Sequence, residues 1–353
     1  MAKQINGIQQ VGIGIPNMHE AWKWYRKNFG TDIRVFEEAA PAALMIRYTG
    51  GEVHKRHAAL AVNMQGGGGF EIWQYTSRTP QLPSFEVLYG DLGIFAAKMR
   101  AVDINALFKQ HQENKIEILT QITKDPSGKR HYFVRDPYQN IFEVVEDKYC
   151  FKNENKASGG VLGAIVCVSD IEKSLKLYRD ILGYDQILHD TLDVSPSDLV
   201  GIKGATGKIR RVLLTHSKEK SGGFSKLLGP TQIELVQVFE RAPRNIFENR
   251  FWGDRGFIHL CFDINDMKDL QKECESKGFP FTVDSSNSFD MGEAAGHFSY
   301  IEDPDGTWIE FVETHKVPIL KKIGWYLDLR KRDPKKNLPD WIVKAMAFNR
   351  VKD

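Results

Sequence analysis

The chain has 353 residues, of which 42% are hydrophobic and 27% are charged, and its formal net charge is +2. This length allows two domains of ordinary size, each with its own core. The balanced charge gives no reason to expect nucleic acid or a membrane as a partner. The four cysteines form no Cys-x-x-Cys pair, which argues against a zinc knuckle or a redox motif. The N-terminus lacks signal-peptide features and no stretch reaches the ~20 apolar residues of a membrane helix, so we expect a cytoplasmic protein.

Four segments of the chain show the same succession of expected elements. Each starts with an apolar strand, continues with a helix and ends with further strands, so the repeating module is βαβββ. The first strands begin at Ile8, Leu92, Val161 and Gly256. The residue types that cap helix N-termini place the helix starts at Asn17, Asp103, Ser169 to Asp170, and Asp266.

Two positions recur in every module. One lies in the first strand, seven residues before the helix cap, and holds Gln10, Ala96, Gly163 and His259. The other is a carboxylate in the last strand and holds Glu71, Glu143, Glu234 and Glu310. The separations between the two positions are 61, 47, 71 and 51 residues, so long and short modules alternate. This alternation indicates that a pair of modules has been duplicated.

The polar segment at residues 147–160 is typical of a linker between domains. We therefore predict a first domain at residues 1–150 with modules 1 and 2, and a second at 151–315 with modules 3 and 4. A basic extension, expected to be helical, follows at 316–353, and residues 339–348 predict a helix that docks on the rest of the chain. The fold class is α+β, with curved mixed sheets that form clefts.

The recurring glutamates lie in strands whose two faces are both apolar. Burying a lone carboxylate costs several kcal/mol unless it is paired or binds a metal ion. In the fourth module Ile258 and Leu260 are expected to pack on the helix, which leaves Phe257 and His259 on the cleft face. For a single position, a hydrogen-bonded buried residue is the commoner explanation, and only the fourfold recurrence favours a metal site. Glutamine, glutamate and one imidazole suit a six-coordinate divalent ion better than a closed zinc site.

The sequence resembles the vicinal oxygen chelate superfamily, which includes glyoxalase I, methylmalonyl-CoA epimerase, extradiol dioxygenases and bleomycin-resistance proteins. The resemblance rests on the βαβββ repeats, on "RGFIH" at 255–259 and on "EDPDGTWIE" at 302–310. It implies that two modules enclose one divalent metal ion, and it does not distinguish Zn, Ni, Co, Mn and Fe. Each module is expected to contribute a ligand from its first strand and a glutamate from its last.

The resemblance leaves open which modules pair, and the residues themselves favour one arrangement. Pairing neighbouring modules produces two incomplete ligand sets. Pairing the outer modules 1 and 4 produces a complete set, which consists of Gln10, Glu71, His259 and Glu310. The inner modules 2 and 3 then share a degenerate cleft that holds Ala96, Glu143, Gly163 and Glu234. We therefore predict a single working site between modules 1 and 4, as in monomeric glyoxalase I enzymes.

The two glutamates of the inner cleft need another partner. Lys98 and Arg100 share the strand face of Ala96, so a fixed cation at Lys98 could replace the missing ion. The alternative is that both glutamates contact water in an open groove.

The resemblance implies an isomerase, lyase or epimerase that acts through a metal-bound enediolate on a 2-oxo or 2-hydroxy-carbonyl substrate. Glu310 is expected to be the catalytic base, with Glu71 as the second candidate. Arg255 matches an arginine that holds glutathione in glyoxalase I. The other two glutathione-binding positions are occupied here by Gly14 and Tyr75, which argues against a glutathione adduct.

Two alternatives remain at this point. One is an Fe(II) dioxygenase of the extradiol or 2-oxo-acid type, although only His259 falls on a histidine position of those enzymes. The other is a non-catalytic small-molecule-binding protein similar to the resistance proteins. In all three cases the partner is a small molecule, with a monomer or a homodimer as the assembly.

Overall fold

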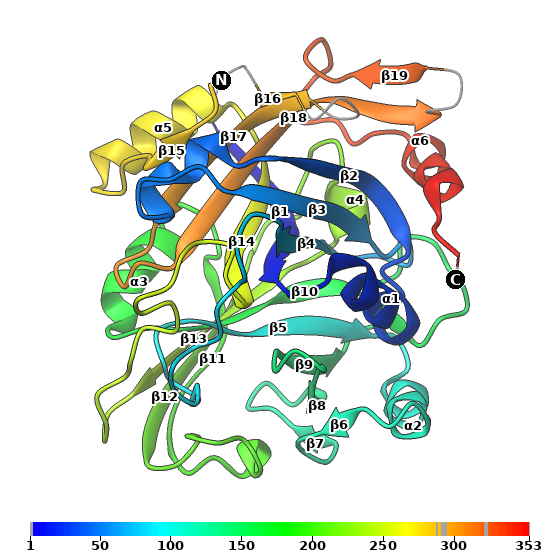
Figure 1. Ribbon diagram of the computed structural model, residues 1–353. Helices are drawn as coiled ribbons and strands as arrows, with labels where there is room; N and C mark the ends of the chain where they lie inside the picture. The colour runs from blue at the N-terminus through cyan, green and yellow to red at the C-terminus, as the bar shows by residue number, and fades with distance from the viewer. Residues whose placement is uncertain (1–2, 287–288, 291–294, 321–323, 353) are drawn as a thin grey trace.

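The fold consists of four successive βαβββ modules and a C-terminal extension (Figure 1). The computed structural model describes residues 3–286, 289–290, 295–320 and 324–352. Module 1 contains β1 (Gln4–Gly14), α1 (Met18–Phe29), β2 (Ile33–Pro41), the 3-10 helix η1 (Ala43–Tyr48), β3 (Lys55–Val62) and β4 (Gly69–Tyr75). Module 2 contains β5 (Gly93–Ala101), α2 (Ile104–Glu113), β6 (Glu117–Ile118), β7 (Thr123–Lys124), β8 (Arg130–Arg135) and β9 (Ile141–Glu146).

The second half of the chain repeats this order. Module 3 contains β10 (Ser158–Cys167), α3 (Ile171–Tyr178), β11 (Gln186–Val194), η2 (Ser197–Leu199), β12 (Lys208–Thr215), α4 (Ser225–Leu228) and β13 (Gln232–Val238). Module 4 contains β14 (Gly256–Asn265), α5 (Met267–Ser276), β15 (Val283–Asp284), β16 (Phe289–Asp290), β17 (Ala295–Glu302) and β18 (Trp308–Leu320). In modules 2 and 4 the strand after the helix is divided into two short pieces that pair with the same neighbour, β6 and β7 with β8, and β15 and β16 with β17. With each divided strand counted once, the predicted βαβββ order is confirmed in all four modules.

The four predicted helix starts are also confirmed. The side chains of the cap residues each accept a hydrogen bond from the backbone N–H three residues later, at Asn17, Asp103, Asp170 and Asp266. These contacts satisfy N–H groups that the first helical turn leaves free.

Two sheets are formed, and each combines modules from both halves of the chain. The outer sheet has the strand order β15-β17-β18-β14-β1-β4-β3-β2 and unites modules 1 and 4. The inner sheet has the order β11-β12-β13-β10-β5-β9-β8-β6 and unites modules 2 and 3. At the centre of each, two first strands pair antiparallel, β1 with β14 and β5 with β10, and each also pairs parallel to a last strand. The predicted pairing of outer with outer and inner with inner modules is therefore confirmed.

The main apolar core lies between the two sheets and the helices of the modules. It contains Val11 and Leu260 from the outer sheet, Ala97 and Ala164 from the inner sheet, and Tyr25 from α1. Both central strand pairs thus direct one face to this core, which leaves their opposite faces for the clefts. Within the described residues, no helix has both the length and the apolar character needed to cross a membrane.

The C-terminal extension is only partly helical, which corrects the expectation of a helical tail. Strand β18 continues beyond residue 315 to Leu320, and β19 (Trp325–Asp328) folds back on it with Val317 opposite Leu327. The predicted docking helix is present as α6 (Asp340–Ala345), followed by the 3-10 helix η4 (Met346–Asn349). Met346 packs with Val62 and Leu227, so the extension covers part of the cleft side of module 1.

Candidate metal centre and cavity

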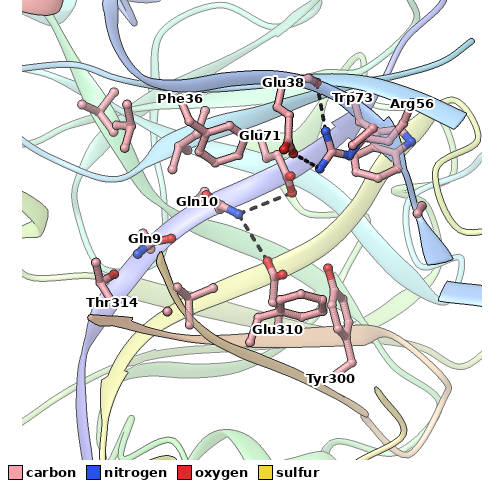
Figure 2. A pocket seen from close by; sticks show the side chains of 18 of the residues that line it. Gln9, Gln10, Phe36, Glu38, Arg56, Glu71, Trp73, Tyr300, Glu310 and Thr314 are labelled. Carbon is pink, nitrogen blue, oxygen red and sulfur yellow. Dashed lines mark hydrogen bonds and ion pairs between the residues drawn. The ribbon is translucent and has the colours of Figure 1, made fainter. Parts of the chain in front are cut away.

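The structure brings together the four residues that the sequence predicts as metal ligands. Gln10 and His259 come from the paired central strands β1 and β14, while Glu71 and Glu310 come from the adjoining last strands β4 and β18. The Nε2 of His259 lies 3.0 Å from an oxygen of Glu310 and 3.3 Å from an oxygen of Glu71. The Gln10 amide donates to the same two oxygens, at 3.2 Å to Glu310 and 3.5 Å to Glu71 (Figure 2).

The His259 ring is held in place by its neighbours. It stacks on Trp252 with ring centroids 5.9 Å apart, and its Nδ1 lies 3.4 Å from the hydroxyl of Tyr300. A Cβ on Gly12 would lie only 2.3 Å from the imidazole, so a glycine is required where the ring crosses β1.

The carboxylates and the imidazole shift each other's protonation. Burial lowers the pKa of His259, but the charges of Glu310 and Glu71 outweigh it and raise the pKa to about 9. Burial raises the pKa of Glu310, yet the neighbouring imidazolium brings it below its usual range. The pair therefore favours an ionised Glu310, which is the state that a ligand or a base requires.

The arrangement fits a divalent ion. One histidine nitrogen and one oxygen from each glutamate lie within 4.8 Å of one another. Two ligands about 2.1 Å from the same ion are separated by roughly 3.0–3.4 Å, which matches the distances from His259 to the two carboxylates. Among the residues that the structure describes, His259 Nε2 makes no well-aligned hydrogen bond and the buried Oε1 of Gln10 has no partner. A half-turn of the Gln10 amide directs that oxygen to the other ligand atoms.

A cavity of about 330 Å³ adjoins these residues. Gln10, Glu71, Glu310 and Tyr300 line one end, while His259 is fully buried behind them. The remaining wall is mostly apolar and includes Phe36, Leu60, Leu227, Leu228, Val317 and Met346. It therefore receives side chains from module 1, from α4 of module 3 and from the extension.

The strand that carries His259 departs from the simple alternation expected from sequence. Phe257 packs in the main core with Leu260, whereas Ile258 joins Trp252 and Tyr300 on the cleft side. The expectation that Ile258 faces the helix and Phe257 the cleft was therefore wrong. The reason is a β-bulge, seen as a register shift between the pairs Val11–Leu260 and Ile13–Phe257, which reverses the side-chain order.

Arg255 does not line the cavity that holds the predicted ligands. It borders a second cavity of about 280 Å³, together with Phe257 and Tyr138. Its backbone N–H donates to the Gln81 carbonyl, and its own carbonyl accepts from Arg250, which fixes the residue just before β14. The expected role of Arg255 in substrate binding is therefore not supported at this site.

The inner cleft contains a buried ion cluster in place of a cavity with free ligands. The ammonium of Lys98 lies 2.5 Å from Glu143 and 2.6 Å from Glu234, and all three side chains are at most 1% exposed. The guanidinium of Arg211 donates to Glu234 at 2.8 Å. His131 contacts the other oxygen of Glu143 at 2.7 Å. Of the two interpretations left open by the sequence, the cation is confirmed and the water-filled groove is wrong.

The first-strand positions of the inner cleft cannot supply ligands. Ala96 has no ligand atom, and a Cβ on Gly163 would lie 1.8 Å from the backbone oxygen of Gln232. Arg100, expected on the same face as Lys98, contacts Asp147 at 2.9 Å and does not reach the glutamates.

The sequence analysis missed the residues that surround the predicted ligands. Tyr300 lies opposite Glu310 across the β17–β18 hairpin, and this pairing could have been inferred from the turn at "EDPDGT". Trp252 and Met346 had no such local signal, since Trp252 lies in the loop before β14 and Met346 follows β18 at a distance in sequence. Arg56 was also missed; it lines the cavity and donates two hydrogen bonds to Glu38, at 2.7 and 2.9 Å (Figure 2).

A sequence model of the family described as "Glyoxalase/Bleomycin resistance protein/Dioxygenase superfamily" matches residues 7–144 and 161–311. The chain belongs to this superfamily. Its two matched regions correspond to modules 1 and 2 and to modules 3 and 4.

Relatives and solved structures agree with this assignment. A lactoylglutathione lyase of Schizosaccharomyces pombe (strain 972 / ATCC 24843) is 28% identical over 152 residues, which is 42% of this chain and 45% of the relative. The match thus spans less than half of that enzyme. A lactoylglutathione lyase of Pseudomonas putida is 24% identical over 150 residues, or 41% of this chain and 80% of the relative. This distant similarity to lyases supports an enzyme of the superfamily.

The fold similarity covers most of the chain. The structure of glyoxalase I from Zea mays superposes with a TM-score of 0.56 at 14% identity and covers 88% of this chain and 92% of that chain. A putative dioxygenase from Bacillus subtilis subsp. subtilis str. 168 has a TM-score of 0.59 at 14% identity, with coverages of 88% and 86%. At such low identity these likenesses show the fold alone.

Proposed function

We propose that the chain is a metal-dependent isomerase, lyase or epimerase that moves a proton on a 2-oxo or 2-hydroxy-carbonyl compound. The observation that carries this proposal is the convergence of Gln10, Glu71, His259 and Glu310 at one end of a largely apolar cavity. When bound there, a divalent ion supplies a Lewis acid for negative charge that develops on adjacent substrate oxygens.

The protein side chains have separate tasks in this proposal. Glu310 takes the proton from the substrate carbon, because it borders the cavity beside the other predicted ligands. Glu71 is the second candidate for the base, since it borders the same cavity and its contacts with Gln10 and His259 are longer than those of Glu310. The apolar wall excludes water around the reacting carbon and holds the rest of the substrate.

We further propose that the substrate carries an apolar substituent and is not a glutathione adduct. Glutathione has two carboxylates that need cations, and Arg56 is the one Lys or Arg among the described residues that line the cavity. Its guanidinium is already paired with Glu38. The Tyr75 hydroxyl donates to the Trp252 carbonyl, and Gly14 packs against the Asp254 carbonyl, so neither residue offers a replacement handle.

The experiment that tests the proposed reaction combines elemental analysis with a substrate screen. The purified protein is reconstituted with Zn, Ni, Co, Mn or Fe, and 2-oxo and 2-hydroxy-carbonyl compounds with apolar groups are screened by solvent deuterium exchange. We expect one ion at the predicted ligand set and exchange at the carbon next to the carbonyl. Oxygen consumption without exchange supports a dioxygenase instead, and a chain that binds small molecules but retains no metal supports a binding protein.

The dioxygenase alternative has less support from the ligands. Non-haem Fe(II) oxygenases use two histidines and one carboxylate, whereas the ligands here are one histidine, two glutamates and a glutamine. The base is identified by comparing Glu310→Gln with Glu71→Gln in the exchange assay, with bound metal measured in both. In the variant that lacks the true base, the rate of deuterium exchange is expected to fall by a larger factor than the amount of bound metal.

A further inference from the structure

A second group of metal-ligating side chains lies on module 1, away from the cavity. His19 is in the first turn of α1, Glu37 is on β2 and His57 is on β3. The Nε2 atoms of the two histidines approach the same carboxylate oxygen of Glu37, at 3.2 Å from His57 and 3.7 Å from His19. Three possible ligand atoms, one from each residue, lie within 4.8 Å of one another.

Strand alternation separates this group from the predicted catalytic site. Phe36 and Glu38 on β2 and Arg56 on β3 line the cavity. Glu37 lies between Phe36 and Glu38 and His57 follows Arg56, so the side chains of Glu37 and His57 point to the opposite face of the sheet. None of the three residues of the group is in the cavity wall.

The geometry and chemistry of the group fit a transition metal. Two ligands about 2.1 Å from a tetrahedral ion are roughly 3.4 Å apart, which lies between the two measured distances. The guanidinium of Arg34 donates to the other oxygen of Glu37 at 3.2 Å, which orients the carboxylate and leaves Oε1 toward the histidines. The His57 and Glu37 side chains are 25% and 20% exposed and the His19 side chain is 66% exposed, so the remaining coordination position faces water.

We propose that His19, Glu37 and His57 form a second metal site that takes a borderline divalent ion such as Zn²⁺ and fastens α1 to the β2–β3 hairpin. Two imidazoles and one carboxylate select Zn, Ni, Cu or Co over Mg and Ca, which prefer oxygen ligands. The site is independent of the cleft, because it shares no residue with the predicted ligand set.

Zinc stoichiometry tests this proposal. The full chain and its variants are dialysed against micromolar Zn²⁺ and analysed for bound metal, with His259→Ala to remove the cleft site. We expect two ions in the wild type, one in His259→Ala, one in His57→Ala and one in His19→Ala. If the cleft proves to bind no metal, the wild type holds one ion and His57→Ala none, so failure of the proposed function is distinguishable from failure of this site.

The matched control is His315→Ala. His315 also approaches a carboxylate, that of Glu313 at 3.7 Å, but among the described residues these two belong to no group of three possible metal ligands. We expect this variant to bind as much zinc as the wild type. A thermal measurement adds a second test, with both variants made in a His259→Ala background. Zinc is expected to raise the Tm of His315→Ala, since an ion that binds only the native state stabilises it, and to leave the Tm of His19→Ala unchanged. Equal zinc content in His57→Ala and wild type overturns the proposal and leaves a surface ion pair only.

Discussion

The outer and inner clefts have the same framework and opposite contents. Each is built from two paired first strands and two last strands that carry a glutamate, as Glu71 and Glu310 in one and Glu143 and Glu234 in the other. In the outer cleft the glutamates meet His259 and Gln10 beside a cavity. In the inner cleft they meet the ammonium of Lys98. Both clefts thus keep a buried carboxylate pair. The group between the two carboxylates differs: a fixed ammonium occupies this place in the inner cleft, whereas the outer cleft has further potential metal ligands beside a cavity.

Equivalent positions on the neighbouring strands show how the inner cleft was filled. The position compared faces the residue two places after each glutamate, on the neighbouring antiparallel strand. In the outer sheet this position holds Ala58 beside the Glu71 strand and Phe298 beside the Glu310 strand. The corresponding residues of the inner sheet are Arg211 and His131, which bind Glu234 and Glu143. Asp198 joins the cluster through Arg211 at 2.6 Å. Lys98 and Arg211 are the cations of the cluster, and together with the His131 imidazole they contact all three carboxylates, which is the kind of pairing that lets charged groups tolerate burial.

The largest expected effect comes from the same substitution at matched positions of the two clefts. Glu310→Gln replaces a charged ligand by a neutral amide, and we expect metal affinity and turnover to fall by at least about 100-fold. Glu143→Gln occupies the equivalent place in the inner cleft, and we expect it to keep both metal content and turnover. Elemental analysis and the exchange assay measure the two outcomes. Loss of metal in both variants, or in neither, would contradict the assignment of one working site.

The second prediction concerns stability. Lys98→Met leaves Glu143 and Glu234 without their shared cation, so we expect the free energy of unfolding to fall by about 3–5 kcal/mol, with metal content unchanged in the folded protein. Urea denaturation measures the change. Lys109→Met is the control, because Lys109 pairs with Glu113 on the surface, where both side chains are more than half exposed, and we expect no measurable change there. A Lys98 variant as stable as this control would show that the inner glutamates do not need a cation.

The contrast between the clefts also shows where sequence reasoning succeeds. The module spacing, the helix caps and the recurring glutamates are local patterns, and they sufficed to predict that Gln10 meets Glu310 across 300 residues of sequence. They also named a fixed cation such as Lys98 as one of two possible partners for the inner glutamates, and the structure shows Lys98 between them. The bulge at Ile258 was not predictable, because it arises from the pairing of β1 with β14 and leaves no mark in residue type. The contribution of Met346 to the cavity was missed for a similar reason, since a short helix in an extension can dock on many surfaces.

The third prediction is that the buried glutamate pair of the inner sheet, Glu143 and Glu234, and the buried Asp263 of the outer sheet make stability respond to pH in opposite directions. Burial raises the pKa of Glu143 and Glu234, but Lys98 outweighs it and lowers both, so their stabilisation is present above the unfolded pKa of about 4.3 and is lost as the pH falls below it. In the outer sheet, burial raises the pKa of Asp263 to about 7. The folded chain therefore holds a proton that the unfolded chain releases, and stability decreases as the pH rises from about 4 to about 7.

Unfolding measured from pH 4 to pH 8 checks this difference. We expect wild type to lose stability relative to Asp263→Asn as the pH rises, by up to about 1.4 kcal/mol per pH unit. The difference between Glu143→Gln and wild type is expected to stay constant above about pH 5 and to shrink as the pH falls from there through the unfolded pKa of about 4.3. Parallel curves for wild type and Asp263→Asn would show that the Asp263 carboxyl titrates equally in the folded and unfolded chain.

The smallest expected effect tests whether the extension shapes the outer cavity. Met346 lines the cavity and is 9% exposed, whereas Phe348, two residues later on the same 3-10 helix, is 76% exposed. Met346→Ala removes apolar wall without touching the predicted ligands, so it weakens binding of an apolar substituent equally in the ground state and the transition state. We expect KM to rise roughly fivefold, about 1 kcal/mol, with kcat unchanged, while Phe348→Ala leaves both constants as they are. If Met346→Ala lowers kcat at constant KM, the extension acts on the reacting groups; if both variants behave alike, the cavity wall does not hold the substrate.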